Sequence, residues 1–259
     1  MNRDELSSII GDLAAEQAVI LRLIESLPDE AWDRPSPAEG WTLRDCVVHL
    51  AETDESAFDA VAGTERERPG PRSGVNTPGQ LAARDVKPTQ VVEWYSSSAA
   101  RLVEALRSLD PEARPTWAGR PMGARSFISA RIMEHWSHGL DIHDAAGVEA
   151  VDSDRLRHVA HLGWLTRDFA FRNRGLTPPS EPFFIELQAP SGQTWSWGPP
   201  DAAQRIIGSA SDFCRVVTQR IHWSDTDLRT EGLDAAEFLK IAQAFAGPPG
   251  SGRPPGSGA

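Results

Sequence analysis

The sequence is poor in cysteine and contains no long apolar run, and each absence excludes a class of protein. Two cysteines, Cys46 and Cys214, cannot build a disulfide framework in a chain of 259 residues, so we expect a reducing environment. No stretch of about 18 consecutive apolar residues is present, which argues against a membrane-spanning helix. The N-terminus carries Asp4 and Glu5 where a signal peptide would need an apolar segment. The sequence therefore predicts a cytoplasmic protein.

Basic residues are also scarce. The chain has 26 lysines and arginines against 37 aspartates and glutamates, and its formal net charge is −11. No basic stripe is available to neutralise phosphate groups, which argues against a nucleic-acid partner. The same negative charge argues against an anionic membrane surface as partner. We therefore expect small molecules as partners of a protein that is a monomer or a homodimer.

Four segments in the first half of the chain have the apolar spacing of amphipathic helices. Pro28 ends the first segment, and Thr42 with Asp45 forms a capping-box-like start for the second, with Trp41 as a hydrophobic staple. The expected helices cover residues 3–27, 42–61, 90–109 and 126–145. Residues 63–80 are rich in proline and glycine, and they predict a loop long enough to be a lid.

The character of the sequence changes after residues 147–152, which we interpret as a hinge. Residues 182–190 and 192–198 alternate like the two strands of a hairpin. The other elements expected beyond the hinge are one helix over 153–173, a strand at 203–207, and helices over 209–219 and 234–245. The pattern predicts an α+β fold, with a four-helix bundle at 1–150, a smaller mixed α+β domain at 151–247 and a disordered tail at 248–259.

The fourth expected helix carries a stripe of groups that can bind metal. Glu134 and His138 are four residues apart, so their side chains lie one above the other on one face, and Asp141 continues the stripe. Metal sites in helical bundles are built from side chains on facing helices, which makes His49 on the second helix a plausible third ligand. Two imidazoles and one carboxylate leave coordination positions open, as a catalytic metal requires.

The same residues also have less specific explanations. His49 can be a core histidine whose hydrogen bonds are satisfied, and Glu134 can pair with Arg131 on its own helix. Cys46 lies one turn before His49 and could approach a metal, although a small buried thiol is the commoner case. His135 points about 100° away from Glu134 around the helix, so we assign it to packing or to a loop contact.

Two motifs together resemble a known family. Gly40-Trp41-Thr42, Asp45 and His49-Leu50, followed by Glu134, His138 and Asp141, resemble the metal-binding domain of mycothiol-dependent maleylpyruvate isomerases. This domain is part of the DinB-like helical-bundle superfamily. The likeness covers residues 5–145, and the C-terminal part resembles the smaller domain of that family more loosely.

The resemblance implies a ligand set and a cosubstrate. A divalent metal, zinc above iron or nickel, would be held by the residues matching His49, Glu134 and His138. Asp141 would be a catalytic polar group near the site. Arg220 of the second domain would face the cleft and bind the cosubstrate, a mycothiol-like thiol.

These implications favour a metal-dependent enzyme that binds a low-molecular-weight thiol as thiolate and uses it to isomerise or S-alkylate a small electrophile. Arg220 would hold a carboxylate or the polar head of the thiol, and Asp141 would orient a ligand or shuttle a proton. Two alternatives remain open. The metal could activate water or oxygen instead, or the chain could be a non-catalytic, metal-stabilised protein that binds a small ligand.

Overall fold

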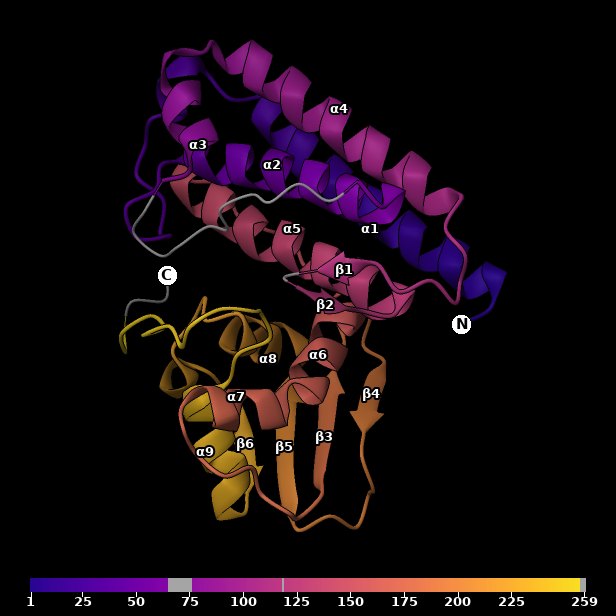
Figure 1. Cartoon of the computed structure of the whole chain (residues 1–259). Coiled ribbons are helices and arrows are strands. Elements are labelled where there is room, and N and C mark those ends of the chain that lie inside the picture. Colours follow the sequence, from indigo (N-terminus) through magenta and orange to yellow (C-terminus); the bar gives the residue numbers. More distant parts are fainter. Residues whose placement is uncertain (65–75, 118, 257–259) are drawn as a thin grey trace. The chain divides into compact units, whose positions relative to one another are not determined.

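The computed structural model describes residues 1–64, 76–117 and 119–256 (Figure 1). The chain divides into two compact units, Met1–Ala150 and Val151–Ala259. The first unit is helical and the second combines a sheet with helices, so the predicted α+β fold is confirmed. Within the described ranges, no helix is both long and apolar enough to cross a membrane.

The first unit is built from four long helices, and each of the four predicted helices is confirmed. They are α1 (Arg3–Glu25), α2 (Leu43–Ala62), α4 (Pro88–Arg107) and α5 (Ala124–Ala146). Shorter elements connect them: η1 (Asp29–Ala31), α3 (Pro78–Ala82), η2 (Ala83–Asp85), β1 (Thr116–Trp117) and β2 (Arg120–Pro121). The ribbon of β1 and β2 was not predicted. The predicted lid falls largely on residues 65–75, which lie outside the described residues.

The bundle packs α1 against α4 and α5, and α2 against the same two helices (Figure 1). Its apolar side chains form two clusters. The first joins the end of α1, the starts of α2 and α4, and the end of α5: for example Ile24, Val47, Val91 and Ile142. The second joins the start of α1 with the ends of α2 and α4 and the start of α5: for example Leu6, Ala60, Leu106 and Phe127. Therefore α1 and α5 run in one direction, and α2 and α4 run in the other.

Local chemistry explains where α2 begins and ends. The Thr42 hydroxyl accepts from the Asp45 N–H, and the Asp45 carboxylate accepts from the Thr42 N–H at 2.9 Å, so the predicted capping box is confirmed. Trp41, just before the cap, is buried in the first apolar cluster. The helix stops at Gly63, whose left-handed φ of 67° suits glycine. These signals fix which residues α2 presents to the bundle.

The second unit is a four-stranded sheet with order β4-β3-β5-β6 and flanking helices. The strands are β3 (Phe183–Gln188), β4 (Thr194–Trp197), β5 (Gln204–Ser209) and β6 (Arg229–Glu231). The helices are α6 (Leu156–Leu165), α7 (Arg167–Asn173), α8 (Ala210–Val217), η3 (Trp223–Asp225) and α9 (Leu233–Ile241). The predicted hairpin of β3 and β4 is confirmed as an antiparallel pair. β5 lies parallel to β3, and β6 lies antiparallel to β5.

Two details of the second unit differ from the sequence-based expectation. The single helix predicted over 153–173 is wrong, because α6 and α7 are separated at Thr166, whose hydroxyl donates to the Leu162 carbonyl at 2.9 Å. The last helix is shorter than predicted and ends at Ile241. Residues 248–256 follow without helix or strand, and the Gly250 carbonyl accepts from Arg174 at 2.7 Å. The last three residues of the predicted tail are outside the described residues.

Two helix-interior glycines should respond in opposite ways to alanine. A Cβ on Gly11 in α1 would meet nothing within 4 Å, so Gly11→Ala should stabilise the protein by about 0.5–1 kcal/mol through helix propensity. A Cβ on Gly163 in α6 would lie 2.9 Å from Phe213 and 3.0 Å from Val217. Gly163→Ala should therefore destabilise by about 1–3 kcal/mol through overpacking. Denaturant unfolding of both variants measures the change in the free energy of unfolding. Equal changes in the two variants would contradict close packing of α6 on α8.

Candidate metal centre

The structure brings His49, Glu134 and His138 together in the first unit. His49 lies in the second turn of α2, and the other two lie one turn apart on α5. Glu134 Oε2 is 3.2 Å from His49 Nε2 and 3.8 Å from His138 Nε2. One potential ligand atom from each residue lies within 4.8 Å of the others. Three side chains that are far apart in the sequence therefore converge on one point.

The three side chains of the cluster differ in exposure. The side chain of His49 is 3% exposed, whereas those of His138 and Glu134 are 14% and 24% exposed. Burial acts to raise the pKa of the Glu134 carboxyl, but the hydrogen bond from His49 and the charges of His49 and His138 outweigh it. The charge of Arg131 acts in the same direction, and together they hold the pKa of Glu134 well below its usual range. Glu134 is therefore an anion near neutral pH.

Asp141 holds one of the imidazoles. Its Oδ2 lies 3.0 Å from His138 Nδ1, and its side chain is 1% exposed. When Nδ1–H donates to this carboxylate, the lone pair of His138 is on Nε2, the atom that faces Glu134. A carboxylate behind a histidine is the usual arrangement around a metal-bound imidazole, because it fixes the tautomer and the ring orientation.

The donor set fits a divalent cation of intermediate softness. Two imidazole nitrogens and one carboxylate oxygen suit zinc, and they also suit iron or nickel. Three protein ligands would leave further coordination positions for other ligands, and the side chains of Glu134 and His138 are partly exposed. The geometry is therefore consistent with the role predicted for His49, Glu134 and His138 as metal ligands.

Trp41 forms an aromatic wall against both imidazoles. Its ring centroid is 5.0 Å from that of His49 and 5.5 Å from that of His138, and it stacks on the latter with an interplanar angle of 25°. The sequence predicted this residue only as a helix staple. The capping signal at Thr42 places the indole next to His49, but nothing in the sequence pairs it with His138.

Cys46 belongs to a second group of potential ligands. Its sulfur, one nitrogen of His138 and one oxygen of Asp141 also lie within 4.8 Å of one another. The thiol is fully buried and donates to Ser36 Oγ at 3.4 Å. Because this group shares His138 with the first one, it is part of the same centre and not a separate site.

His135, which the sequence analysis assigned to packing or a loop contact, belongs to a buried hydrogen-bonded cluster that the sequence did not predict. It is fully buried, and its Nε2 lies 3.0 Å from both carboxylate oxygens of Asp54 on α2. Arg131 also donates to Asp54, at 2.9 Å. Arg131 therefore pairs with Asp54 and not with Glu134, the partner considered in the sequence analysis. Gln17 donates to the same carboxylate at 2.8 Å. A buried polar cluster therefore lies one turn from the candidate ligands.

The electrostatics of the buried cluster keep Asp54 charged. Burial acts to raise its pKa, but the charges and hydrogen bonds of His135 and Arg131 outweigh it and lower the pKa below its usual range. Tyr95, whose hydroxyl lies 3.3 Å from His135 Nδ1, has its pKa raised by burial and by the charge of Asp54. Tyr95 is therefore a neutral hydrogen-bonding partner.

Arg220 belongs to the second unit, where it follows α8. Its guanidinium donates to the Thr218 carbonyl at 2.7 Å. The preceding residue, Gln219, has a φ of 60°, which is uncommon for a residue other than glycine. The predicted binding role of Arg220 stays a prediction, as does the catalytic role of Asp141.

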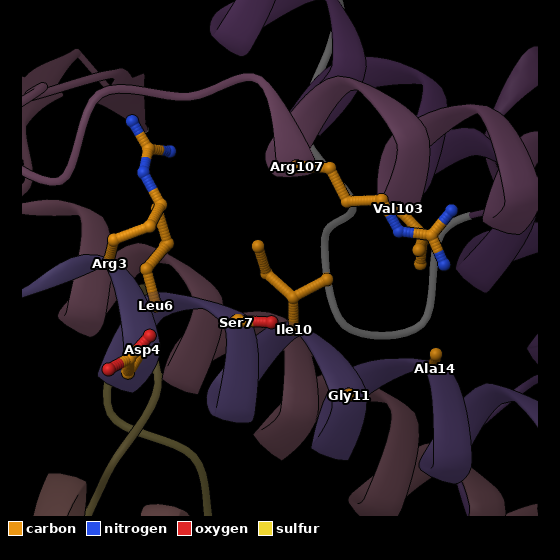
Figure 2. A pocket seen from close by; sticks show the side chains of 9 residues that line it. All are labelled: Arg3, Asp4, Leu6, Ser7, Ile10, Gly11, Ala14, Val103 and Arg107. Atoms are coloured by element: carbon orange, nitrogen blue, oxygen red, sulfur yellow. The ribbon is translucent and has the colours of Figure 1, made fainter.

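A surface cavity of about 440 Å³ lies between the start of α1 and the end of α4 (Figure 2). Arg3, Asp4 and Arg107 provide its charges. Both arginines are engaged, Arg3 with the Leu109 carbonyl at 2.7 Å and Arg107 with Glu104 at 2.9 Å. The cavity adjoins the second apolar cluster, at the opposite end of the bundle from His49, and it is not part of the candidate metal centre.

Fold and site together define a two-unit protein with two imidazoles and a carboxylate gathered in its helical unit. The chain belongs to the family described as the mycothiol maleylpyruvate isomerase N-terminal domain, whose family model matches residues 13–143, half of the chain. The resemblance noted in the sequence is therefore confirmed. A second family model, wyosine base formation, matches residues 179–231.

The chain is also similar to two relatives and two solved structures over most of its length. Two proteins from two strains of Mycobacterium tuberculosis, both described as uncharacterized, are 45% identical over 252 residues, covering 94% of this chain and 97% of theirs. Two crystal structures, of the mycothiol-dependent maleylpyruvate isomerase and of a mutant of it, match with a TM-score of 0.58. They cover 89% of this chain and 95% of the solved one, at 19% identity, which shows a shared fold.

Proposed function

We propose that this chain is a metal-dependent enzyme that uses a mycothiol-like thiol to isomerise or S-alkylate a small electrophilic substrate. Membership of the mycothiol maleylpyruvate isomerase family supports an isomerase-like activity and a thiol cosubstrate. The observation that carries the proposal is the convergence of His49, Glu134 and His138 within 4.8 Å. We further propose that the protein acts in the cytoplasm.

Each candidate residue has a separate role in this proposal. His49 and His138 would present their Nε2 atoms, and Glu134 its carboxylate, to a divalent cation, most suitably zinc. Such a cation, when bound, favours the deprotonated and nucleophilic form of a thiol at neutral pH. Asp141 keeps His138 in the required tautomer and is therefore a positioning residue. We assign to Arg220 the binding of a carboxylate or of the polar head of the thiol.

The thiol chemistry needs no further reactant. The thiolate sulfur adds to one carbon of an activated double bond, and the electron pair of that bond moves onto the electron-withdrawing group. Rotation about the resulting single bond and loss of the thiolate restore the double bond with the opposite geometry. Retention of the new carbon–sulfur bond, with proton uptake at the neighbouring carbon, gives the S-alkylated product instead.

An open site favours catalysis over a purely structural metal. Structural zinc sites are closed by four protein ligands, whereas catalytic sites keep a position for water or substrate. The partial exposure of Glu134 and His138 supports the second case. An enzyme that activates water or oxygen would share this geometry, so the thiol must be tested directly.

The purified, zinc-loaded protein should turn over an activated cis-alkene acid only when a low-molecular-weight thiol is present. Chelation should remove the activity and added zinc should restore it, because the thiol's ionisation depends on the cation. Mass spectrometry and absorbance measure the isomer and any S-alkylated product. Turnover that needs metal but not thiol would contradict the proposal and favour activation of water or oxygen.

A further inference from the structure

The buried cluster around Asp54 ties all four long helices together. Asp54 comes from α2, Arg131 and His135 from α5, Gln17 from α1 and Tyr95 from α4. Each of these side chains is at most 5% exposed. The Tyr95 hydroxyl donates to the Gln17 carbonyl at 3.1 Å and so connects α4 to α1. These contacts form a directional network of hydrogen bonds inside the bundle.

The network is directly connected to the candidate metal ligands. Arg131 Nη2 donates to Thr53 Oγ1 at 3.0 Å, and Thr53 Oγ1 donates to the His49 carbonyl at 2.7 Å. On α5, Arg131 and His135 lie on either side of Glu134 in sequence. The helices α2 and α5 supply the three candidate ligands and, about one turn away, Asp54, Arg131 and His135 of the network.

Stability alone does not explain such a cluster. Replacing a buried ion pair by apolar groups of similar volume is often neutral or stabilising, because desolvating the charges offsets their attraction. Apolar contacts between helices are also weakly directional and tolerate small shifts along the axis. A carboxylate that accepts from both Arg131 and His135 on one helix fixes the axial and rotational position of α2 relative to α5.

We propose that Asp54 is a positioning residue for the metal centre: it holds α2 and α5 in the register that directs His49 at Glu134 and His138. The inference rests on the proposed metal site, since it assigns those three residues as ligands. It predicts that the loss of Asp54 affects metal affinity beyond what the loss of stability explains.

The test compares Asp54→Asn with Leu102→Ala in the full-length protein. Leu102 is fully buried in the second apolar cluster, away from the network, so its truncation destabilises the bundle without moving the ligands. Zinc affinity is measured by competition with a chromophoric chelator, and stability by thermal unfolding of the metal-free proteins. Asp54→Asn should bind zinc at least about tenfold more weakly, the range for residues that support ligands. Leu102→Ala should bind zinc within about twofold of the wild type.

Three further variants keep the test decisive if Asp54→Asn folds poorly. His135→Gln retains a side-chain N–H that can donate to Asp54 and should largely preserve zinc affinity, whereas His135→Leu should lose it. Thr53→Ala removes the hydroxyl between Arg131 and His49 and should weaken binding while leaving the fold intact. The absorption spectrum of the cobalt-substituted protein reports the same ranking through the coordination geometry.

The outcomes separate this inference from the proposed function. Stoichiometric zinc in the wild type, with affinity unchanged in Asp54→Asn and in Thr53→Ala, would overturn the inference alone. Equal losses of affinity in Asp54→Asn and Leu102→Ala, at equal losses of stability, would also overturn it. Absence of stoichiometric zinc from the wild type would overturn both the inference and the proposed metal site.

Discussion

Replacing His138 with alanine is expected to abolish stoichiometric metal binding and, with it, thiol-dependent turnover. His138 would supply one of three ligands, and its ring is already oriented by Asp141 at 3.0 Å. Alanine removes the ligand and leaves the Asp141 carboxylate without that partner. Elemental analysis of the purified variant should show a fall from about one metal ion per chain to almost none.

His143→Ala is the matched control for this prediction. His143 lies on the same helix, and its Nδ1 is 3.1 Å from the Val148 carbonyl near the helix end, beyond the candidate ligands. The control should retain both metal and activity. Unchanged metal content in the His138 variant would show that the ligand assignment is wrong.

The second large effect is expected from Arg131→Leu, which should destabilise the protein by about 3–5 kcal/mol. The arginine and Asp54 form an ion pair at 2.9 Å in which the two side chains are 1% and 0% exposed. Leucine leaves a buried carboxylate without its arginine partner, and removing one member of a buried pair is far more harmful than removing both. Denaturant unfolding at neutral pH, where Asp54 is charged, measures the loss.

Arg107→Ala provides the comparison. Arg107 pairs with Glu104 at 2.9 Å, but the two side chains are 64% and 72% exposed. Exposed ion pairs contribute about 0–1 kcal/mol, so this variant should be almost as stable as the wild type. Similar effects of the two substitutions would mean that the Asp54 cluster is hydrated in solution.

The helical unit was predictable because local signals agree with the apolar pattern. Pro28 follows the end of α1, Thr42 and Asp45 cap α2, and the buried apolar residues of both helices recur at helical spacing. The helices and strands of the second unit were harder to predict from the sequence. The apolar pattern continues across Thr166, where the hydrogen bond to Leu162 accompanies a break between helices. The polar residues Arg229–Glu231 lack the alternation of a strand, and β6 forms only by pairing with β5.

The candidate centre was predictable in part. The spacing of Glu134 and His138 follows from helix geometry alone, whereas adding His49 required a tertiary assumption that the family resemblance supplied. The Asp54 cluster could not be predicted in this way. Asp54 and Arg131 are 77 positions apart, and each alone looks like a charged residue on the solvated face of an amphipathic helix. Only the packing of α2 against α5 shows that they meet in the interior.

Glu134, His138 and Asp141 all lie on the same helix. This placement limits which sequence changes homologues can tolerate there. Successive residues of an α-helix are rotated by about 100°, so one inserted or deleted residue between 134 and 138 would turn the two candidate ligands to different sides. Point substitutions at the intervening positions leave this angular relation unchanged. Homologues with the same chemistry should therefore differ in sequence along this stretch but keep its length.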